Sequence, residues 1–150
     1  MNKAAIDDIY RPVSAIIVRR YKFNRNRTEL SYMLVQKPRK SHAWQFPQGG
    51  QDQEETGAEA ALRELREECG SDLKVSLVDT IPIGIYQYKF PRKRTDGYIG
   101  AKVSFFRADY LFGQCQPDGK EIIDYEWLIR EKIDEYVHPE YKEALKSVFF

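Results

Sequence analysis

The chain is 150 residues long, a length that suits one domain with a hydrophobic core of its own. Hydrophobic residues make up 42% of it and charged residues 31%, as in globular proteins. The 24 basic and 23 acidic residues leave a net charge of +1, so no overall field draws the protein to nucleic acid or to a membrane surface. No apolar run approaches the roughly eighteen residues of a membrane-spanning helix.

The cysteines and the N-terminus carry little information about location. Two cysteines, Cys69 and Cys115, do not predict the disulfide framework of a small secreted domain, and we expect two reduced thiols. The first ten residues lack the apolar core of a signal peptide and include Asp7 and Asp8, which transit peptides avoid. The sequence therefore predicts no targeting segment, no membrane partner and a single domain over residues 1–150.

Three strands are predicted before the middle of the chain. Residues 12–21 are β-branched and nearly continuously apolar, which predicts a strand buried on both faces, and residues 30–36 follow the same pattern. The polar segment 23–29 between them is typical of a hairpin-like loop. Aromatic residues predict a short third strand from Trp44 to Phe46.

An amphipathic helix is predicted to begin near Thr56 or Gly57 and to run to Cys69. At about 100° per residue its apolar positions share one arc that faces a core. These positions are Ala58, Ala61, Leu62, Leu65 and Cys69.

Three carboxylates, Glu64, Glu67 and Glu68, are predicted to share an adjoining, exposed side of this helix. Like charges at these spacings repel, so a cation is the natural counterpart. Mg²⁺ is a hard ion that binds a few carboxylates together with substrate phosphates. The glycines Gly49 and Gly50, just before the helix, let the backbone approach such a site closely.

The second half of the chain predicts strands followed by short helices. Residues 73–90 form one long or broken strand, with Pro82 and Gly84 marking an edge, a bend or a bulge. Strands at 101–112 and 124–129 follow, and two short helical signals after Arg130 are split at His138 and Pro139. Strands on both sides of one helix, with helices at the end, predict a mixed sheet covered on both faces, an α/β/α sandwich.

The helix and the segment before it resemble the Nudix box. Gly49 is followed after five residues by Glu55 and, after seven more, by Arg63-Glu64-Leu65-Arg66-Glu67-Glu68-Cys69-Gly70. The last position, usually a bulky aliphatic residue, is Ser71. The resemblance implies the Nudix α/β/α fold and a Mg²⁺-dependent hydrolase. It also implies ligands from Glu64, Glu67, Glu68 and the Gly49 carbonyl, and orienting contacts from Arg63 and Glu55.

A second resemblance covers more than half of the chain, from about Cys69 to the end. The phrases GIYQYKFPRKRT, GAKVSFFRADYLFG and HPEYKEALKSV resemble the family of large-subunit protein forty-six of the mitochondrial ribosome. That resemblance implies a mitochondrial location, and partners among mitochondrial ribosomal proteins and ribosomal RNA. The phrase WQFPQGG instead resembles RNA pyrophosphohydrolases and dinucleoside-polyphosphate hydrolases.

Basic clusters are either a solvated rim or contacts to phosphate or RNA. The candidates for substrate or RNA contact are Arg39, Lys40, Arg92, Lys93 and Arg94, with a further cluster between Arg19 and Arg27. His42 and His138 lack metal-ligand spacing, so we expect them to be structural.

Two hypotheses from different classes therefore stand. In one, the chain is a structural constituent of the mitochondrial large ribosomal subunit, near the central protuberance, and its Nudix box is inherited from the ancestry of the fold. In the other, it is an active Mg²⁺-dependent hydrolase in which metal-bound water cleaves a dinucleoside polyphosphate or an RNA 5′ pyrophosphate. The sequence favours the first, because its C-terminal phrases are typical of one family whereas the box is typical of a superfamily.

Overall fold

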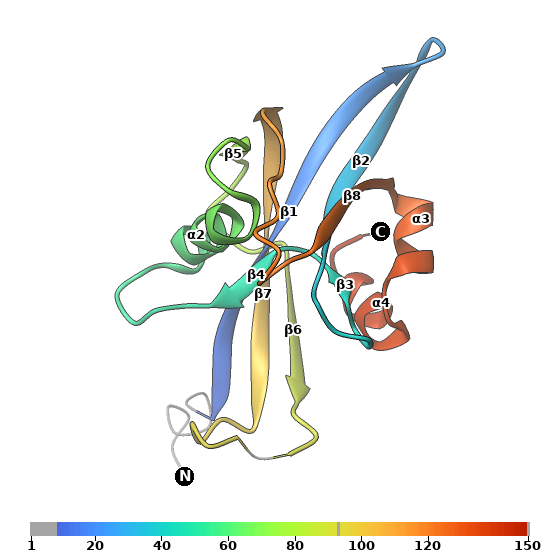
Figure 1. The fold of residues 1–150 in the computed structure, drawn as a ribbon. Helices are drawn as coiled ribbons and strands as arrows, with labels where there is room; N and C mark the ends of the chain where they lie inside the picture. The colour runs from blue at the N-terminus through green and yellow to red at the C-terminus, as the bar shows by residue number, and fades with distance from the viewer. Residues whose placement is uncertain (1–8, 93, 150) are drawn as a thin grey trace.

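The computed structural model describes residues 9–92 and 94–149, which form a twisted sheet with helices on both faces (Figure 1). The strands are β1 (Tyr10–Asn24), β2 (Arg27–Gln36), β3 (Trp44–Gln45), β4 (Gln48–Gly50), β5 (Lys74–Leu77), β6 (Gly84–Lys89), β7 (Gly100–Phe112) and β8 (Asp124–Ile129). The helices are α2 (Gly57–Cys69), α3 (Arg130–Tyr136) and α4 (Pro139–Leu145).

The sheet is mixed, as predicted. Its main path runs β3-β2-β1-β7-β5, while β4 pairs with β1, β6 with β7 and β8 with β2. The central strands β1 and β7 are parallel, with Val13 opposite Val103, and the other pairs are antiparallel. Both central strands are long, and their middle parts are largely buried, which accounts for the continuous apolar segments in the sequence.

Side chains along β1 point alternately to the two faces of the sheet, and each face carries one layer of the core. Ala15 and Ile17 face one cluster together with α3 and α4 residues such as Ile133 and Leu145. Ile16 and Val18, pointing the other way, pack with an α2 cluster formed by Ala58, Ala61, Leu65 and Cys69. With a helix layer on each face, the predicted α/β/α sandwich is confirmed.

The element boundaries differ from the prediction in three places. The loop predicted at 23–29 is a tight turn at Arg25 and Asn26, so β1 and β2 extend almost to each other. The segment 73–90 is two strands, separated around Pro82. The short strand β4 was not predicted, because its three residues carry no hydrophobic pattern and pair with β1 only through the backbone.

No helix within the described residues is long and apolar enough to cross a membrane.

Candidate active site

A capping box fixes the start of α2 and therefore the direction of its carboxylates. The Thr56 hydroxyl accepts a hydrogen bond from the Glu59 N–H at 3.1 Å, and the Glu59 carboxylate accepts one from the Thr56 N–H at 3.0 Å. These bonds satisfy N–H groups that the first helical turn leaves free. The helix begins at Gly57 and ends at Cys69, as predicted.

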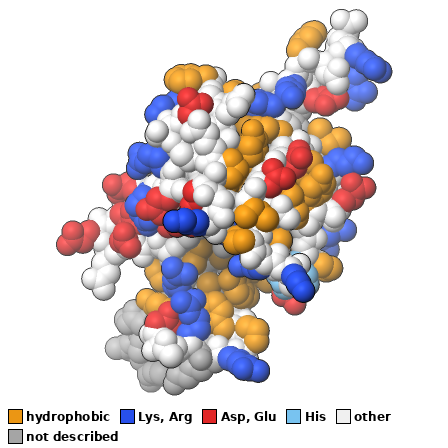
Figure 2. Space-filling model, viewed as in Figure 1, with side chains coloured by type: hydrophobic (Ala, Val, Ile, Leu, Met, Phe, Trp, Pro, Cys, Tyr) orange, Lys and Arg blue, Asp and Glu red, His pale blue; other side chains and the backbone are white. Residues whose placement is uncertain are grey.

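Three carboxylates converge at one side of this helix, from Glu64, Glu67 and Glu121. One oxygen from each lies within 4.8 Å of the others. Glu121 comes from the loop before β8, where the Asp118 carboxylate accepts hydrogen bonds from the backbone N–H groups of three following residues, Glu121 among them. Figure 2 shows acidic and basic side chains gathered over α2 and the segment that leads into it.

Arg63 holds the carboxylates in place through its whole guanidinium group. Its Nη2 donates to Glu55 Oε1 at 2.6 Å and to the Gly50 carbonyl at 2.8 Å. Its Nη1 donates to Glu64 Oε1 at 2.9 Å and to Glu67 Oε1 at 3.1 Å. The predicted contacts between Arg63 and these carboxylates are therefore present in the structure.

The pKa values of the carboxyl groups around Arg63 differ because their surroundings differ. Hydrogen bonds from Arg63 lower the pKa of Glu55 to about 2, so Glu55 remains a carboxylate. Burial raises the pKa of Glu64, and the neighbouring charge of Glu67 raises it further. The buried Glu64 carboxyl group therefore favours its neutral form more than an ordinary glutamate does.

Gly49 leaves room for the Glu64 carboxylate. A Cβ at Gly49 would collide with the carboxylate carbon and both of its oxygens. In β4 this glycine lies opposite Ser14, so the sheet fixes the position of the backbone beside Glu64. The requirement for glycine here is therefore one of space.

Glu68 departs from the prediction. Its side chain is 0% exposed, so the expectation that it shares an exposed side with Glu64 and Glu67 is wrong, and Glu64 itself is only 9% exposed. Lys37 Nζ donates to Glu68 Oε2 at 2.7 Å, and the Gln48 N–H donates to Glu68 Oε1 at 3.0 Å. Burial raises the pKa of Glu68 to about 7, although both donors favour its charged form. The predicted burial of Leu65 is confirmed, whereas Leu62 is only half-buried.

A pocket of about 480 Å³ opens beside Gln48, between β3, β6 and α4. Its aromatic walls include Trp44, Tyr86 and Tyr88, and the rings of the two tyrosines stack with centroids 5.4 Å apart. Arg39 and Lys89 add positive charge to its lining. The pocket can therefore accept a planar aromatic group that carries negative charge.

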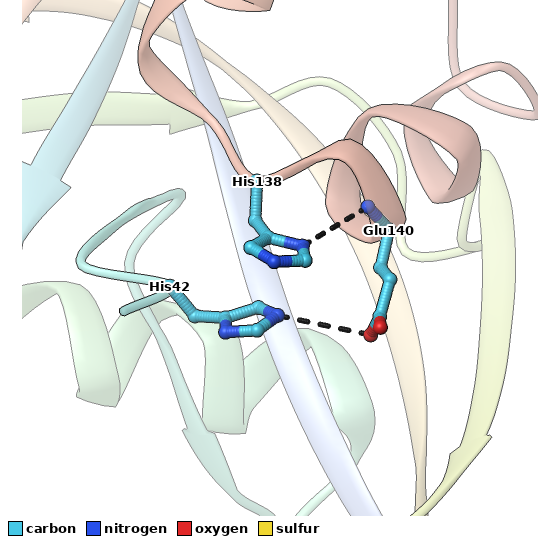
Figure 3. Close-up of side chains that lie close together, drawn as sticks. All are labelled: His42, His138 and Glu140. Carbon is cyan, nitrogen blue, oxygen red and sulfur yellow. Dashed lines mark hydrogen bonds and ion pairs between the residues drawn. The ribbon is translucent and has the colours of Figure 1, made fainter. Parts of the chain in front are cut away.

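His42 and His138 meet at the edge of this pocket, which the sequence did not predict. Figure 3 shows their rings stacked, with Glu140 beside both, and the ring centroids are 3.6 Å apart. His138 Nδ1 accepts a hydrogen bond from the Glu140 N–H at 3.2 Å and so caps α4. The three side chains are close enough together to hold a metal ion. We nevertheless assign His138 a structural role, because the cap already uses its Nδ1 lone pair.

The predicted basic contacts are dispersed. Arg39 lines the pocket, where it also donates to the His42 carbonyl and to Gln45 Oε1. Lys40 and Arg92 are exposed. Arg94 pairs with Asp96 at 3.0 Å and lies over the Phe90 ring, while Lys93 falls outside the described residues.

Glu121 is the site residue that sequence analysis missed. Its one signal is an acidic residue in the turn before the last strand, and acidic residues are common in turns. Only the fold brings that turn to the side of α2 where Glu64 and Glu67 lie.

A mixed sheet with helices on both faces, and an arginine that bridges two carboxylates of one helix, define an α/β/α protein with an acidic site on α2. The sequence profile of the NUDIX domain matches residues 11–148, and the chain belongs to the Nudix family.

Two kinds of curated relative resemble this chain. The RNA pyrophosphohydrolase of a Nitratiruptor species is 30% identical over 152 aligned positions, covering 91% of this chain and 92% of that protein. The bovine large ribosomal subunit protein mL46 is 31% identical over 102 positions, covering 65% of this chain. The match to the bovine protein spans about a third of its length, 35%.

Among solved structures, a C. elegans Ap4A hydrolase binary complex superimposes with a TM-score of 0.73. The match covers 92% of this chain and 94% of that one at 18% identity, a level that shows the shared fold alone.

Proposed function

We propose that this chain, as a single Nudix domain over residues 1–150, is a Mg²⁺-dependent hydrolase that cleaves a phosphoanhydride bond at an RNA 5′ end or in a dinucleoside polyphosphate. The observation that carries the proposal is the convergence of Glu64, Glu67 and Glu121, held in part by Arg63. The neighbouring pocket supports a substrate with an aromatic base.

The carboxylates fit a hard divalent cation, which prefers oxygen ligands. Glu64, Glu67 and Glu121 would hold it, and the Gly49 carbonyl remains a predicted fourth ligand. Glu68 can join only by giving up the short contact of its Oε2 with Lys37. A divalent cation held by these residues would supply a water of lowered pKa and positive charge beside the substrate phosphates.

The remaining roles belong to side chains of this chain. Arg63 and Glu55 orient Glu64 and Glu67, since Arg63 bridges all three carboxylates. Arg63 therefore fixes where Glu64 and Glu67 present their oxygens to a cation.

The pocket would bind the substrate base and its phosphates. Tyr86 and Tyr88 would stack on the base, and Arg39 would contact a phosphate. Lys40, Arg92, Lys93 and Arg94 remain predicted contacts for the outer part of the substrate or for RNA.

The second candidate is a structural role in the mitochondrial large ribosomal subunit, with mitochondrial ribosomal proteins and ribosomal RNA as partners and the mitochondrion as location. The similarity to mL46 proteins of cattle and rat, both 31% identical, favours it. Sequence alone ranked this candidate first. The carboxylate group completed by Glu121, and the relative matched over 92% of its length, now support the hydrolase more strongly.

The test is a panel of 5′-triphosphate RNAs and dinucleoside polyphosphates incubated with purified protein and Mg²⁺. We expect turnover of at least one substrate, abolished by a chelator and reduced more than about 100-fold by Glu67→Gln. Glu143→Gln, an exposed change on α4, is the matched control and should keep full activity. A panel without turnover, together with co-sedimentation of the protein with mitochondrial ribosomes, would replace the hydrolase by the ribosomal role.

A further inference from the structure

The hairpin formed by β1 and β2 projects beyond the rest of the sheet (Figure 1). The last pair between β1 and β7 joins Arg19 to Asp109, and the pairing of β2 with β8 starts at Ser31. Between these points, the strands pair only with each other, from Arg20 opposite Ser31 to Asn24 opposite Arg27. Residues 21–28 therefore form a two-stranded ribbon that is exposed on both faces.

The ribbon ends in a tight turn with a defined shape. Arg25 and Asn26 have φ values of 49° and 63°, the left-handed conformation that a two-residue primed turn needs at both central positions. Such turns match the twist of the flanking strands. The cross-strand pairs therefore fix the backbone at the tip and the face from which each side chain leaves it.

One face of the ribbon carries exposed aromatic rings. Tyr21 and Phe23 are two residues apart, so they point to the same face, and their exposures are 62% and 80%. Their cross-strand partners on this face, Leu30 and Thr28, are too small to cover them. The rings add little to the core, because they lie beyond both packed clusters.

Cations lie at the turn, where Arg25 is placed, and on the face opposite the rings, to which strand alternation directs Lys22 and Arg27. Lys22, Arg25 and Arg27 are all exposed, and Glu29 is the one acidic residue in the segment 20–30. Within the described residues, none of the three cations lies within 4.0 Å of a carboxylate. Figure 2 shows the same mixture, with hydrophobic and basic side chains together at the projecting tip.

We infer that this hairpin is a contact site for single-stranded nucleic acid, in which Tyr21 and Phe23 stack on bases and Arg25 at the turn contacts a phosphate, while Lys22 and Arg27 on the opposite face add positive charge. Aromatic rings with open faces bind unpaired bases of any sequence, and neighbouring cations hold the backbone. A duplex would hide its base faces from the rings. A folded protein partner would need a broader surface than a two-stranded tip offers.

This inference does not rest on the proposed hydrolase activity. None of the ribbon residues belongs to the carboxylate group or lines the aromatic pocket. Binding of single-stranded nucleic acid at the hairpin is compatible both with a hydrolase of RNA 5′ ends and with a ribosomal protein.

Binding can be measured with the full chain by fluorescence anisotropy. The probe is an unstructured, labelled RNA of about 20 nucleotides with a 5′-hydroxyl end, in the presence of a chelator, so that neither metal nor a 5′ phosphate contributes. We expect Phe23→Ala to raise Kd at least fivefold by loss of stacking, and Arg25→Glu to raise it at least tenfold. Arg25→Glu should also make the dependence of Kd on salt less steep. Lys146→Glu, a charge reversal on an exposed residue just after α4, is the control and should change Kd less than twofold.

A DNA strand of the same sequence distinguishes RNA binding from binding to any single strand. If its Kd is similar to that of the RNA, the site binds single strands in general. If the DNA binds much more weakly, the site is specific for RNA. The inference is overturned if the wild type binds neither strand, if Phe23→Ala leaves Kd unchanged, or if a duplex binds as tightly as the single strand. It is also overturned if sedimentation shows self-association that Phe23→Ala abolishes without affecting Kd. Hydrolysis of a dinucleoside polyphosphate, measured in parallel, reports on the proposed function separately.

Discussion

Glu67 and Glu68 are consecutive residues of α2, yet their carboxylates have opposite surroundings. The Glu67 side chain is 47% exposed and contacts Arg63 on the side where Glu64 and Glu121 converge. The Glu68 side chain is 0% exposed and is fixed between Lys37 and the Gln48 N–H. A rotation of about 100° along the helix moves the carboxylate from solvent to the interior.

Two neighbouring residues of one motif therefore have different roles: Glu67 is placed to bind a cation, and Glu68 stabilises the fold. Glu67 can exchange part of its hydrogen bonding for a cation, because water already reaches it. Glu68 is neutralised by Lys37, so it behaves as part of the packing between α2, β2 and β4. Three variants test this comparison, in order of decreasing expected effect on stability.

Leu65→Asp should unfold the domain. Leu65 is 4% exposed in the α2 cluster, so a carboxylate there would be buried among apolar side chains. We expect a loss of more than about 4 kcal/mol in the free energy of unfolding, measured by urea denaturation. Arg66→Asp, the exposed neighbour, is the control and should stay folded. Similar urea midpoints for both variants would contradict the assigned orientation of the helix.

Lys37→Met should destabilise the protein by roughly 3 kcal/mol, because it leaves the buried Glu68 carboxylate without its cation. Lys146→Met removes an exposed lysine paired with Glu143 at 2.9 Å and should cost less than about 1 kcal/mol. Equal melting temperatures for the two variants would mean that the Lys37–Glu68 pair contributes nothing to folding.

Glu68→Gln should change how stability depends on pH. The folded-state pKa of Glu68 is about 7, raised by burial from an ordinary value of 4.5. Because the folded protein holds the Glu68 proton more tightly than the unfolded chain does, protonated Glu68 stabilises the fold. This contribution is fully present below about pH 4.5 and is lost as pH rises to about 7. Between these values the wild type should lose on the order of 2 kcal/mol more than Glu68→Gln, measured by chemical denaturation in a chelator. Parallel pH curves would refute the raised pKa.

Much of this fold follows from local sequence patterns. The apolar segment of β1 and the start of α2 after Thr56 are predicted from the sequence, and the structure confirms both. The strand β4 escaped prediction because backbone pairing alone defines it. The turn at Arg25 and Asn26 escaped it because arginine rarely adopts positive φ, so the residues do not signal a primed turn.

The site was only partly predictable, for reasons of tertiary structure. Helical spacing brings Glu64 and Glu67 together, and their contact with Arg63 follows from the motif. Spacing does not reveal that Lys37, from the end of β2, reaches Glu68 and removes it from solvent. Glu121 and the His42–His138 stack likewise depend on segments that only the folded sheet brings together.

Binding of Mn²⁺, a paramagnetic substitute for Mg²⁺, tests most directly whether Glu67 and Glu121 hold a cation while Glu68 serves the fold. Titration of the wild type, Glu67→Gln, Glu121→Gln and Glu68→Gln at about pH 7.5 would use calorimetry or electron paramagnetic resonance. We predict that Glu67→Gln and Glu121→Gln each raise Kd at least about tenfold, and that Glu68→Gln stays within about twofold of the wild type. A Glu68→Gln protein that binds as weakly as Glu67→Gln, beside a Glu121→Gln protein that binds like the wild type, would contradict this assignment.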